Sequence, residues 1–476
     1  MMEQIKNLSL LSSLCENVNS AIAVHNPATG DVLGYVPSHN REAIEKVIEK
    51  AETAQKSWAK TTAKQRAEIL SRWYQLIMDN QEDLARIMTL EQGKPLAESR
   101  GEVAYGASFV QWFAEEGKRA YGETIPTPLT DRRIMTIRQP VGVAAAITPW
   151  NFPIAMITRK AAPALAAGCS FIGKPAAQTP LSAYAVAELA RQAGLPEGLL
   201  AIVTSSDAVM VGELFCSSPK IQKISFTGST HVGRILMRQS AESVKRVSME
   251  LGGNAPFIVF DDADIDAAVK GALASKFRNA GQTCVCANRF YVHDSVYDEF
   301  VAKFAAEVSK LSVGNGLDDG ITIGPLIDDN AKKKVQTLVN DAVAQGANIT
   351  AGGDDLGGKF FAPTVLTHVE HNMSIVKEEI FGPIAPVIRF HDDASLIDMA
   401  NDTEYGLASY FYSKDINRIF AVAEALDYGM VGVNEGIIST EVAPFGGVKQ
   451  SGIGREGARQ GLDEYLNTKY ICIGGM

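Results

Sequence analysis

Three polar side chains stand in segments rich in small residues or proline, where a reactive group can be reached. Cys284 lies in the sequence NAGQTCVC, Glu250 lies in MELGGN at the end of an expected strand, and Asn151 lies in TPWNFP. A thiol can act as a nucleophile, a carboxylate as a general base, and an amide as a donor to developing negative charge. Each residue also has an ordinary explanation, as a buried thiol, an ion-paired acid or a turn asparagine. Taken one at a time, they do not define a reaction.

Two glycine motifs could bind a phosphate group, and only one has suitable surroundings. The only strict G-x-G-x-x-G is GIGREG, from Gly452 to Gly457. We reject it, because too little chain follows for the ~30-residue βαβ unit that such a motif opens. In SFTGSTHVG, an expected strand runs into Gly228 and Ser229 and then into a helix, whose free N–H groups and dipole attract an anion. An ordinary capped helix start has the same pattern, so this segment alone does not decide.

The elements that must position these residues can be read from the apolar pattern. Short β-rich runs alternate with helical patterns from residue 141 to about residue 433. This alternation predicts parallel sheets in two α/β domains of similar size. The first ~115 residues carry apolar side chains three and four apart and are expected to be largely helical. Strands are expected at 141–147, 169–174, 200–203, 223–226, 256–260 and 290–293, and helices at 265–277 and 295–309.

Two further segments have the pattern of strands with one face in solvent. Residues 133–139 and 469–473 alternate apolar and polar side chains. An exposed antiparallel edge invites pairing with a second subunit. These segments therefore favour a homo-oligomer.

The composition limits the cellular location and the binding partners that we expect for this protein. The chain has 476 residues, of which 46% are hydrophobic and 21% charged, and a formal net charge of −10. It can bury a large core, and its charge repels nucleic acid and anionic lipid. Its six cysteines do not have the pattern of a small disulfide-rich domain. We expect no signal peptide, transit peptide or membrane-spanning segment, and hence a cytoplasmic protein without nucleic-acid or membrane partners.

Together with Lys174 in GKPAAQTP and Glu379 in EEIFGP, these motifs resemble the aldehyde dehydrogenase superfamily, in the family's order, from Asn26 to Gly447. The resemblance implies an aldehyde dehydrogenase-like α/β fold, with a Rossmann-like cofactor domain, a catalytic domain and a small antiparallel oligomerisation element. It also implies a dimer or a tetramer. The expected boundaries are 1–120 and 141–250 for the cofactor domain, 251–433 for the catalytic domain, and 121–140 and 434–476 for the oligomerisation and bridging segments.

The resemblance gives the three polar residues defined roles. Cys284 would add to the aldehyde carbonyl, because the carbon of a free aldehyde does not readily release hydride. The Asn151 amide and the Cys284 backbone N–H would stabilise the resulting oxyanion. Glu250 would activate the water that hydrolyses the thioester, and would help to deprotonate Cys284. The product would be a carboxylic acid.

The resemblance also implies where a nicotinamide cofactor binds. Trp150 and Lys174 would lie near the ribose and adenosine, Gly228 and Ser229 at the pyrophosphate, Leu251 near the nicotinamide, and Glu379 and Phe381 at the nicotinamide ribose. Asn151, Pro175, Ala176 and Ala177 complete the expected cofactor-binding set.

Position 177 bears on the choice of cofactor. Relatives that favour NAD often carry Glu there, and this chain has Ala177. Without a carboxylate to repel a 2′-phosphate, and with Lys174 to attract it, NADP should be accepted, and NAD remains possible. The Ser that is often found here in NADP-using relatives is absent as well.

Three residues resemble the substrate site of the succinate-semialdehyde dehydrogenase branch. They are Arg159 in MITRK, Arg278 in KFR, and Ser439 in IISTEVAP. Two guanidinium groups and a hydroxyl would clamp a carboxylate. The reach from Arg278 to Cys284, about one and a half turns if the helix persists, suits a four-carbon semialdehyde. Either arginine could instead be a structural ion-pair partner.

Other functions remain open. The aldehyde could be glutarate semialdehyde or a small hydroxyaldehyde. An acyl-transferring relative that releases the thioester with coenzyme A would not need Glu250, and a silent structural relative would not need the set of Cys284, Glu250 and Asn151.

Cys286 is a candidate redox partner of Cys284. Two cysteines at i and i+2 can approach disulfide geometry, and a neighbouring thiol can capture a sulfenic acid. The alternative is a small apolar filler. We expect no metal site, because no Cys or His follows at a ligand spacing.

Overall fold

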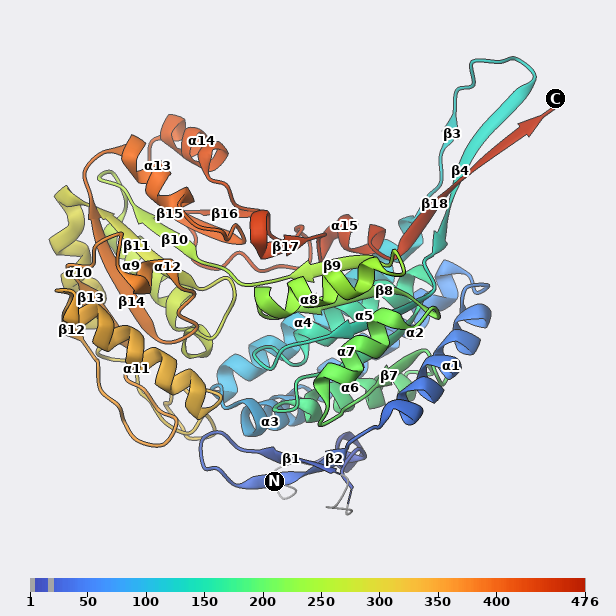
Figure 1. Cartoon of the computed structure of the whole chain (residues 1–476), viewed down its shortest axis with the longest axis horizontal. Helices are drawn as coiled ribbons and strands as arrows, with labels where there is room; N and C mark the ends of the chain where they lie inside the picture. The colour runs from blue at the N-terminus through green and yellow to red at the C-terminus, as the bar shows by residue number, and fades with distance from the viewer. Residues whose placement is uncertain (1–4, 16–20, 476) are drawn as a thin grey trace.

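The computed structural model describes residues 5–15 and 21–475. Two parallel sheets form the two halves of the molecule, and a narrow antiparallel arm projects away from both (Figure 1). Among the described residues, no helix is long and apolar enough to cross a membrane.

The first half is built on a six-stranded sheet in the order β17-β9-β8-β5-β6-β7. Its five main strands are parallel, and the short β17 is antiparallel to β9. The strands are β5 (Val143–Ile147), β6 (Ser170–Lys174), β7 (Leu200–Ile202), β8 (Ile221–Thr227), β9 (Arg246–Glu250) and β17 (Gly452–Ile453).

Helices cover both faces of this sheet, and the alternation of β5 shows why. Val143 and Ala145 pack in a core with residues of α1, α7 and α8, whereas Ala144 and Ala146 pack on the other face with residues of α2 to α6. A strand buried on both faces reads as a continuous apolar run. The helices are α1 (Arg41–Trp58), α2 (Ala63–Asp79), α3 (Gln81–Gln92), α4 (Leu96–Glu116), α5 (Ala155–Ala167), α6 (Pro180–Gln192), α7 (Ala208–Ser217) and α8 (Thr230–Ala241).

The second half is built on a seven-stranded sheet in the order β12-β13-β14-β11-β10-β15-β16. It is parallel except for β12, which is antiparallel to β13. The strands are β10 (Ala255–Val259), β11 (Ala287–His293), β12 (Asn348–Ala351), β13 (Thr364–Thr367), β14 (Ile384–Phe390), β15 (Ala408–Tyr412) and β16 (Met430–Val433). The helices are α9 (Ile265–Phe277), α10 (Asp294–Val308), α11 (Asp329–Ala344), α12 (Ser374–Lys377), α13 (Asp393–Asn401) and α14 (Ile416–Ala425).

The arm is a three-stranded antiparallel sheet that joins distant parts of the chain. Its strands are β3 (Thr124–Ile125), β4 (Arg132–Pro140) and β18 (Leu466–Gly474), and β18 pairs with β4 along its whole length. Met135, Tyr470 and Ile473 on the arm are exposed. The two alternating segments predicted as strands therefore pair with one another.

Several short elements complete the fold. They are the N-terminal hairpin of β1 (Ala21–His25) and β2 (Val32–Pro37), the helix α15 (Ala458–Asp463), and the 3-10 turns η2 (Leu8–Leu11), η4 (Gly117–Arg119), η5 (Arg278–Gly281) and η6 (Lys449–Ser451). The expected strands and the two expected helices of the second half lie within a few residues of their predicted positions. The hairpin lies in the region expected to be largely helical.

Candidate active site

A cleft opens where the parallel strands of the six-stranded sheet end, and residues from both halves line it. In parallel sheets, ligands bind at the carboxyl ends of the strands. Eight predicted site residues line the cleft: Trp150, Asn151, Gly228, Ser229, Leu251, Cys284, Glu379 and Phe381. The sequence analysis did not single out Pro149, Thr227, Gly252, Ala331 and Lys334, which line it as well. Ala331 and Lys334 come from α11, which carried no motif.

Cys284 lies on a loop that is held close to the strand-to-strand connection after Glu250. A Cβ on Gly253 would stand 2.3 Å from the Cys284 carbonyl oxygen, so only glycine permits this approach. Burial raises the pKa of the Cys284 thiol to about 12, Arg159 opposes the rise, and Glu379 and Glu250 add to it. Cys284 at rest is therefore a thiol, and it would need a base to act as a nucleophile.

The helix before Cys284 has its predicted bounds and does not persist toward Cys284, so the condition set for the reach from Arg278 is not met. Helix α9 ends at Phe277, and Asn279 and Ala280 in the following turn have left-handed φ values of 52° and 54°. Gly281 follows with a φ of +73°, and a Cβ there would meet the Gly382 carbonyl oxygen at 2.2 Å. The chain therefore turns sharply between Arg278 and Cys284, and the estimate of their separation as helical turns does not hold. An asparagine and a glycine so close together are the sequence signal for such a helix end.

Asn151 is held by a buried network. Its backbone oxygen accepts hydrogen bonds from Lys94 Nζ at 2.6 Å and Asn279 Nδ2 at 3.1 Å. Lys94 also pairs with Glu102 at 2.5 Å, and both side chains are 1% exposed. The Asn151 side-chain amide donates to the Gln282 carbonyl at 2.9 Å, which ties it to the Cys284 loop and leaves its second N–H for an oxyanion. Within the described ranges, no backbone acceptor is found for the Cys284 N–H.

Glu250 ends β9 and is buried against Gly446. Burial raises the pKa of Glu250 well above its ordinary value, and the negative charge of Glu456 raises it further, while Arg159 and Lys160 oppose the rise. Its Oε2 has no hydrogen-bond partner in the described part of the chain. A carboxylate with a raised pKa is a stronger base at neutral pH than an exposed one.

Arg159 lies on α5, fully buried, and its charge is balanced by Glu456. The Arg159 Nε and the Lys160 ammonium both pair with the Glu456 carboxylate, and the Phe445 ring lies 4.4 Å from the Arg159 guanidinium carbon. Burial works against the charge on Arg159, but Glu456 and the other acidic groups nearby, such as Glu250, together outweigh it and raise the pKa of Arg159. The Arg159 Nη2 is buried and, among the residues described, has no hydrogen-bond partner.

Arg278 and Ser439 are placed less tightly. The Arg278 guanidinium lies 5.3 Å from the Phe152 ring and forms no ion pair with a described residue. Arg159 and Arg278 are both close enough to lower the pKa of Cys284. Ser439 lies on the loop after β16, which reaches α4 through a hydrogen bond from Ser108 to Glu441 at 3.1 Å. No described contact joins Ser439 to either arginine.

The cleft fits a nicotinamide dinucleotide. Gly228 and Ser229 connect β8 to α8, and the side chain of Ser229 caps that helix start, where free N–H groups face an anion. Trp150 and Phe381 pack edge to face with ring centroids 5.6 Å apart, and both line the cleft. Burial raises the pKa of Glu379 to about 7, and its Oε1 accepts from the Gly253 N–H at 2.9 Å.

The loop after β6 is set apart from the cleft lining. Lys174 ends β6, and its ammonium has no ion-pair partner among the residues that the structure covers. Pro175 and Ala176 follow it, and neither they nor Lys174 line the cleft. Ala177 is exposed and lines a separate hollow with Glu91 and Lys359.

Cys286 is buried below the loop and is not bonded to Cys284. Both are free thiols. The Cys286 Sγ donates to the Lys276 carbonyl at 3.3 Å, and the Lys276 ammonium lies beside it. Burial raises the pKa of Cys286, and Lys276 opposes the rise. The redox role stays a prediction.

The rejected glycine motif has a structural role. Gly452 and Ile453 form β17 beside β9, and Glu456 is the partner of Arg159 and Lys160.

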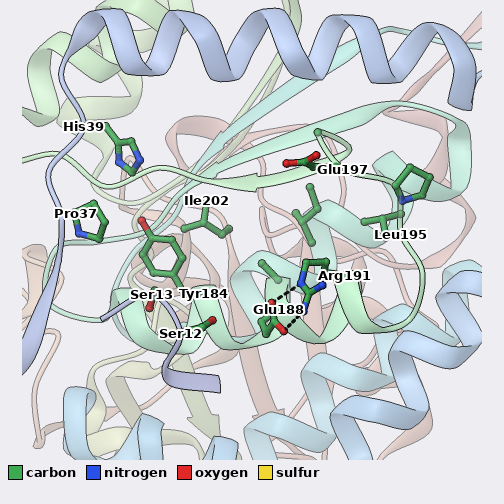
Figure 2. A pocket seen from close by; sticks show the side chains of 14 residues that line it. Ser12, Ser13, Pro37, His39, Tyr184, Glu188, Arg191, Leu195, Glu197 and Ile202 are labelled. Atoms are coloured by element: carbon green, nitrogen blue, oxygen red, sulfur yellow. Dashed lines mark hydrogen bonds and ion pairs between the residues drawn. The ribbon is translucent and has the colours of Figure 1, made fainter. Parts of the chain in front are cut away.

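A different hollow lies beside α6 and β7, where Tyr184, His39 and the ion pair of Arg191 with Glu188 at 2.7 Å form its wall (Figure 2). No predicted site residue is among the described residues that line it.

The comparisons with known proteins agree with this geometry. Over 460 residues, the chain is 60% identical to the succinate-semialdehyde dehydrogenase (NADP+) GabD of Escherichia coli (strain K12), with 96% of this chain and 95% of that protein covered. It is 59% identical over 457 residues to the glutarate-semialdehyde dehydrogenase of Pseudomonas aeruginosa (strain PAO1), with 96% and 94% covered. The crystal structure of an aldehyde dehydrogenase from Brucella melitensis biovar abortus 2308 superposes with a TM-score of 0.98 at 56% identity, covering 99% of each chain.

These similarities confirm the predicted resemblance and the predicted fold class. Residues 15–471 match the sequence pattern of the aldehyde dehydrogenase family. The chain therefore belongs to the aldehyde dehydrogenase family.

Proposed function

We propose that this enzyme oxidises succinate semialdehyde to succinate with NADP, and that it also accepts NAD. The observation that carries the choice of substrate is the Arg159 Nη2, a buried cationic donor with no described partner beside the reactive thiol. A carboxylate at the far end of a short aldehyde supplies the missing acceptor. The name of the relative from Escherichia coli supports both the substrate and the cofactor.

The reaction begins with transfer of the Cys284 proton to Glu250. Burial raises the pKa of Glu250 well above its ordinary value, which makes it a stronger base for the Cys284 thiol than an exposed carboxylate is. The thiolate adds to the carbonyl carbon and forms a carbon–sulfur bond. The Asn151 amide and the Cys284 backbone N–H hold the oxyanion, and each donor of this kind contributes roughly 3–4 kcal/mol.

Collapse of the adduct leaves a thioester on Cys284. When bound, the nicotinamide ring supplies the chemistry of a hydride acceptor. Gly228, Ser229, Glu379 and Phe381 would hold the dinucleotide along the cleft. Glu250 passes the first proton to solvent and, again as a carboxylate, takes a proton from water while the resulting hydroxide attacks the thioester carbon. The carbon–sulfur bond breaks, the Cys284 thiolate regains the proton from Glu250, and the carboxylic acid is released.

Arg159, Arg278 and Ser439 are proposed to hold the substrate carboxylate. A guanidinium presents N–H donors in a plane that matches a carboxylate. Arg278 is the better residue to test, because it forms no ion pair with a described residue, whereas removal of Arg159 would take away one of the two cations that pair with Glu456.

The assembly and location belong to the same proposal. The exposed Met135, Tyr470 and Ile473 support a homo-oligomer that pairs through the arm. The six free thiols, all within the described ranges, support a reducing, cytoplasmic compartment. We keep the predicted domain boundaries: 1–120 and 141–250 for the cofactor domain, 251–433 for the catalytic domain, and 121–140 and 434–476 for the oligomerisation and bridging segments. Strand β17, which comes from the last of these segments, lies in the sheet of the cofactor domain.

Steady-state absorbance at 340 nm tests the proposal. The wild-type enzyme should prefer succinate semialdehyde to butanal, an uncharged aldehyde of the same length. Arg278→Ala should lower kcat/KM for succinate semialdehyde by roughly ten- to a hundredfold, the value of a charge-assisted hydrogen bond, and leave butanal nearly unchanged. Equal losses on both aldehydes would assign Arg278 a structural role.

Glutarate semialdehyde is the second candidate, because a relative of nearly equal identity carries that name. The two aldehydes differ by one methylene, which is worth about 1–3 kcal/mol in a pocket of fixed length. A higher kcat/KM for the five-carbon aldehyde would select this alternative.

A further inference from the structure

A tyrosine hydroxyl lies near the reaction centre with nothing to bind. Tyr105 is on α4, which packs against α5, the helix that carries Arg159. Its ring packs edge to face on Phe109 with centroids 5.0 Å apart. Its hydroxyl is buried and, in the described part of the chain, has no hydrogen-bond partner. A buried hydroxyl without a partner is costly, so such a group calls for a ligand.

The Tyr105 hydroxyl lies beside the Arg159 guanidinium, and only part of that guanidinium is free to bind a substrate. The Arg159 Nε pairs with Glu456, so Arg159 cannot use Nε together with Nη2 to bind both oxygens of a substrate carboxylate. The Arg159 Nη2 remains buried without a described partner. Tyr105 and Arg159 are close enough to act on each other's pKa, so two donors without a described hydrogen-bond partner, one on α4 and one on α5, lie beside each other.

We propose that the Tyr105 hydroxyl is a specificity-determining donor that binds the second oxygen of the substrate carboxylate beside Arg159 Nη2. This inference rests on the proposed function. A carboxylate accepts two parallel hydrogen bonds when its partners provide them. Here the two donors would come from different side chains, because Glu456 occupies part of the arginine.

The electrostatics of the site support a neutral donor at this position. Burial raises the pKa of the Tyr105 phenol, although Arg159 and Arg278 oppose the rise. The hydroxyl is therefore protonated at neutral pH and can donate. Because it carries no charge, it should contribute to the fit of the bound carboxylate and not to long-range attraction of the substrate.

The test compares Tyr105→Phe with wild type on succinate semialdehyde and butanal. We expect kcat/KM for succinate semialdehyde to fall by roughly ten- to a hundredfold, mainly through KM, because the lost donor serves a charged acceptor. Values for butanal should stay within about twofold. Tyr105→Met, which also lacks the hydroxyl, should give the same ratio if the Phe variant folds poorly.

A matched control is Tyr184→Phe. The Tyr184 hydroxyl bonds to Thr204 at 2.8 Å in the hollow of Figure 2, apart from the site. This variant should keep the wild-type ratio between the two aldehydes. As a second readout, succinate should raise the melting temperature of the wild type more than that of Tyr105→Phe.

The outcomes separate the inference from the function on which it rests. If Tyr105→Phe lowers activity on both aldehydes equally, or leaves the ratio unchanged, the assigned role of Tyr105 is wrong while the proposed function stands. If the wild type itself does not prefer succinate semialdehyde to butanal, the proposed function fails, and the inference fails with it.

Discussion

Replacing Glu456 by glutamine should change both the stability and the pH profile of the enzyme. The Glu456 carboxylate contacts Arg159 and Lys160, and the three side chains are 6%, 2% and 0% exposed. Gln keeps the shape and removes the charge. Two buried cations then lose their counter-charge, which in such pairs costs about 3–5 kcal/mol.

The pH profile should move in a defined direction. Glu456 is the largest electrostatic contribution, after burial, to the raised pKa of Glu250. Loss of that negative charge should lower the pKa of Glu250, because a close like charge no longer disfavours the carboxylate. A general base works when deprotonated, so the rate rises as pH passes through its pKa. The acid limb of kcat/KM should therefore move to lower pH in Glu456→Gln.

The assay is kcat/KM for succinate semialdehyde across the stable pH range, together with thermal unfolding. The matched control is Glu464→Gln. Glu464 pairs with Lys223 at 3.1 Å, and Lys223 is also fully buried, but the pair does not act on Glu250. Glu464→Gln should lower stability and leave the acid limb in place. An acid limb that stays fixed or moves to higher pH in Glu456→Gln would refute the coupling.

Three further predictions concern the nucleophile, the cofactor and the neighbouring thiol. Cys284→Ala should abolish oxidation. Glu250→Gln should form the acyl thioester slowly, because the base for Cys284 is lost, and should hydrolyse it more slowly still, so that added mass builds up on Cys284 over long incubation; a Cys284 that stays unmodified would contradict these roles. NADP should serve at least as well as NAD, and Ala177→Glu should shift preference toward NAD by repelling the 2′-phosphate; a wild type that rejects NADP would show the assignment to be wrong. Mild peroxide should inactivate the enzyme and a reducing thiol should restore it, because Cys286 condenses with the sulfenic acid of Cys284 to give a disulfide and water. Cys286→Ala should start fully active but fail to recover, and full recovery would remove the protective role.

The parallel sheets could be predicted from the sequence because their strands are buried on both faces. β5 and β10 read as continuous apolar runs, and α9 has the predicted bounds Ile265–Phe277. The hairpin of β1 and β2 could not be predicted, because its strands are mostly half-buried and give no such run. The spacing of apolar residues in a sequence reflects which side chains are buried. Strands near the surface bury few side chains, so they leave only a weak apolar pattern.

The site was predictable where function resides in a local motif, and not where it depends on distant contacts. Cys284, Asn151 and the glycines near Glu250 are marked by their neighbours in sequence. Lys160 and Glu456 are 296 positions apart, so their pairing has no local signal. Tyr105 looks like any apolar residue on the core side of a helix. Only the packing of α4 on α5 leaves its hydroxyl without a partner.

The charges at the site explain why an anionic aldehyde does not prevent thiolate formation. Arg159 is balanced by Glu456, whose pKa is lowered despite burial by the cations beside it, whereas Arg278 forms no ion pair with a described residue. The Cys284 thiol holds its proton at rest. In the proposed binding mode, the substrate carboxylate would thus neutralise a positive charge that is already present, and it would add no uncompensated negative charge near the sulfur. The new oxyanion must then be stabilised by uncharged donors, chiefly the Asn151 amide. In the proposed mechanism, the arginine clamp would therefore determine which aldehyde binds, and the amide donors would determine how fast it reacts.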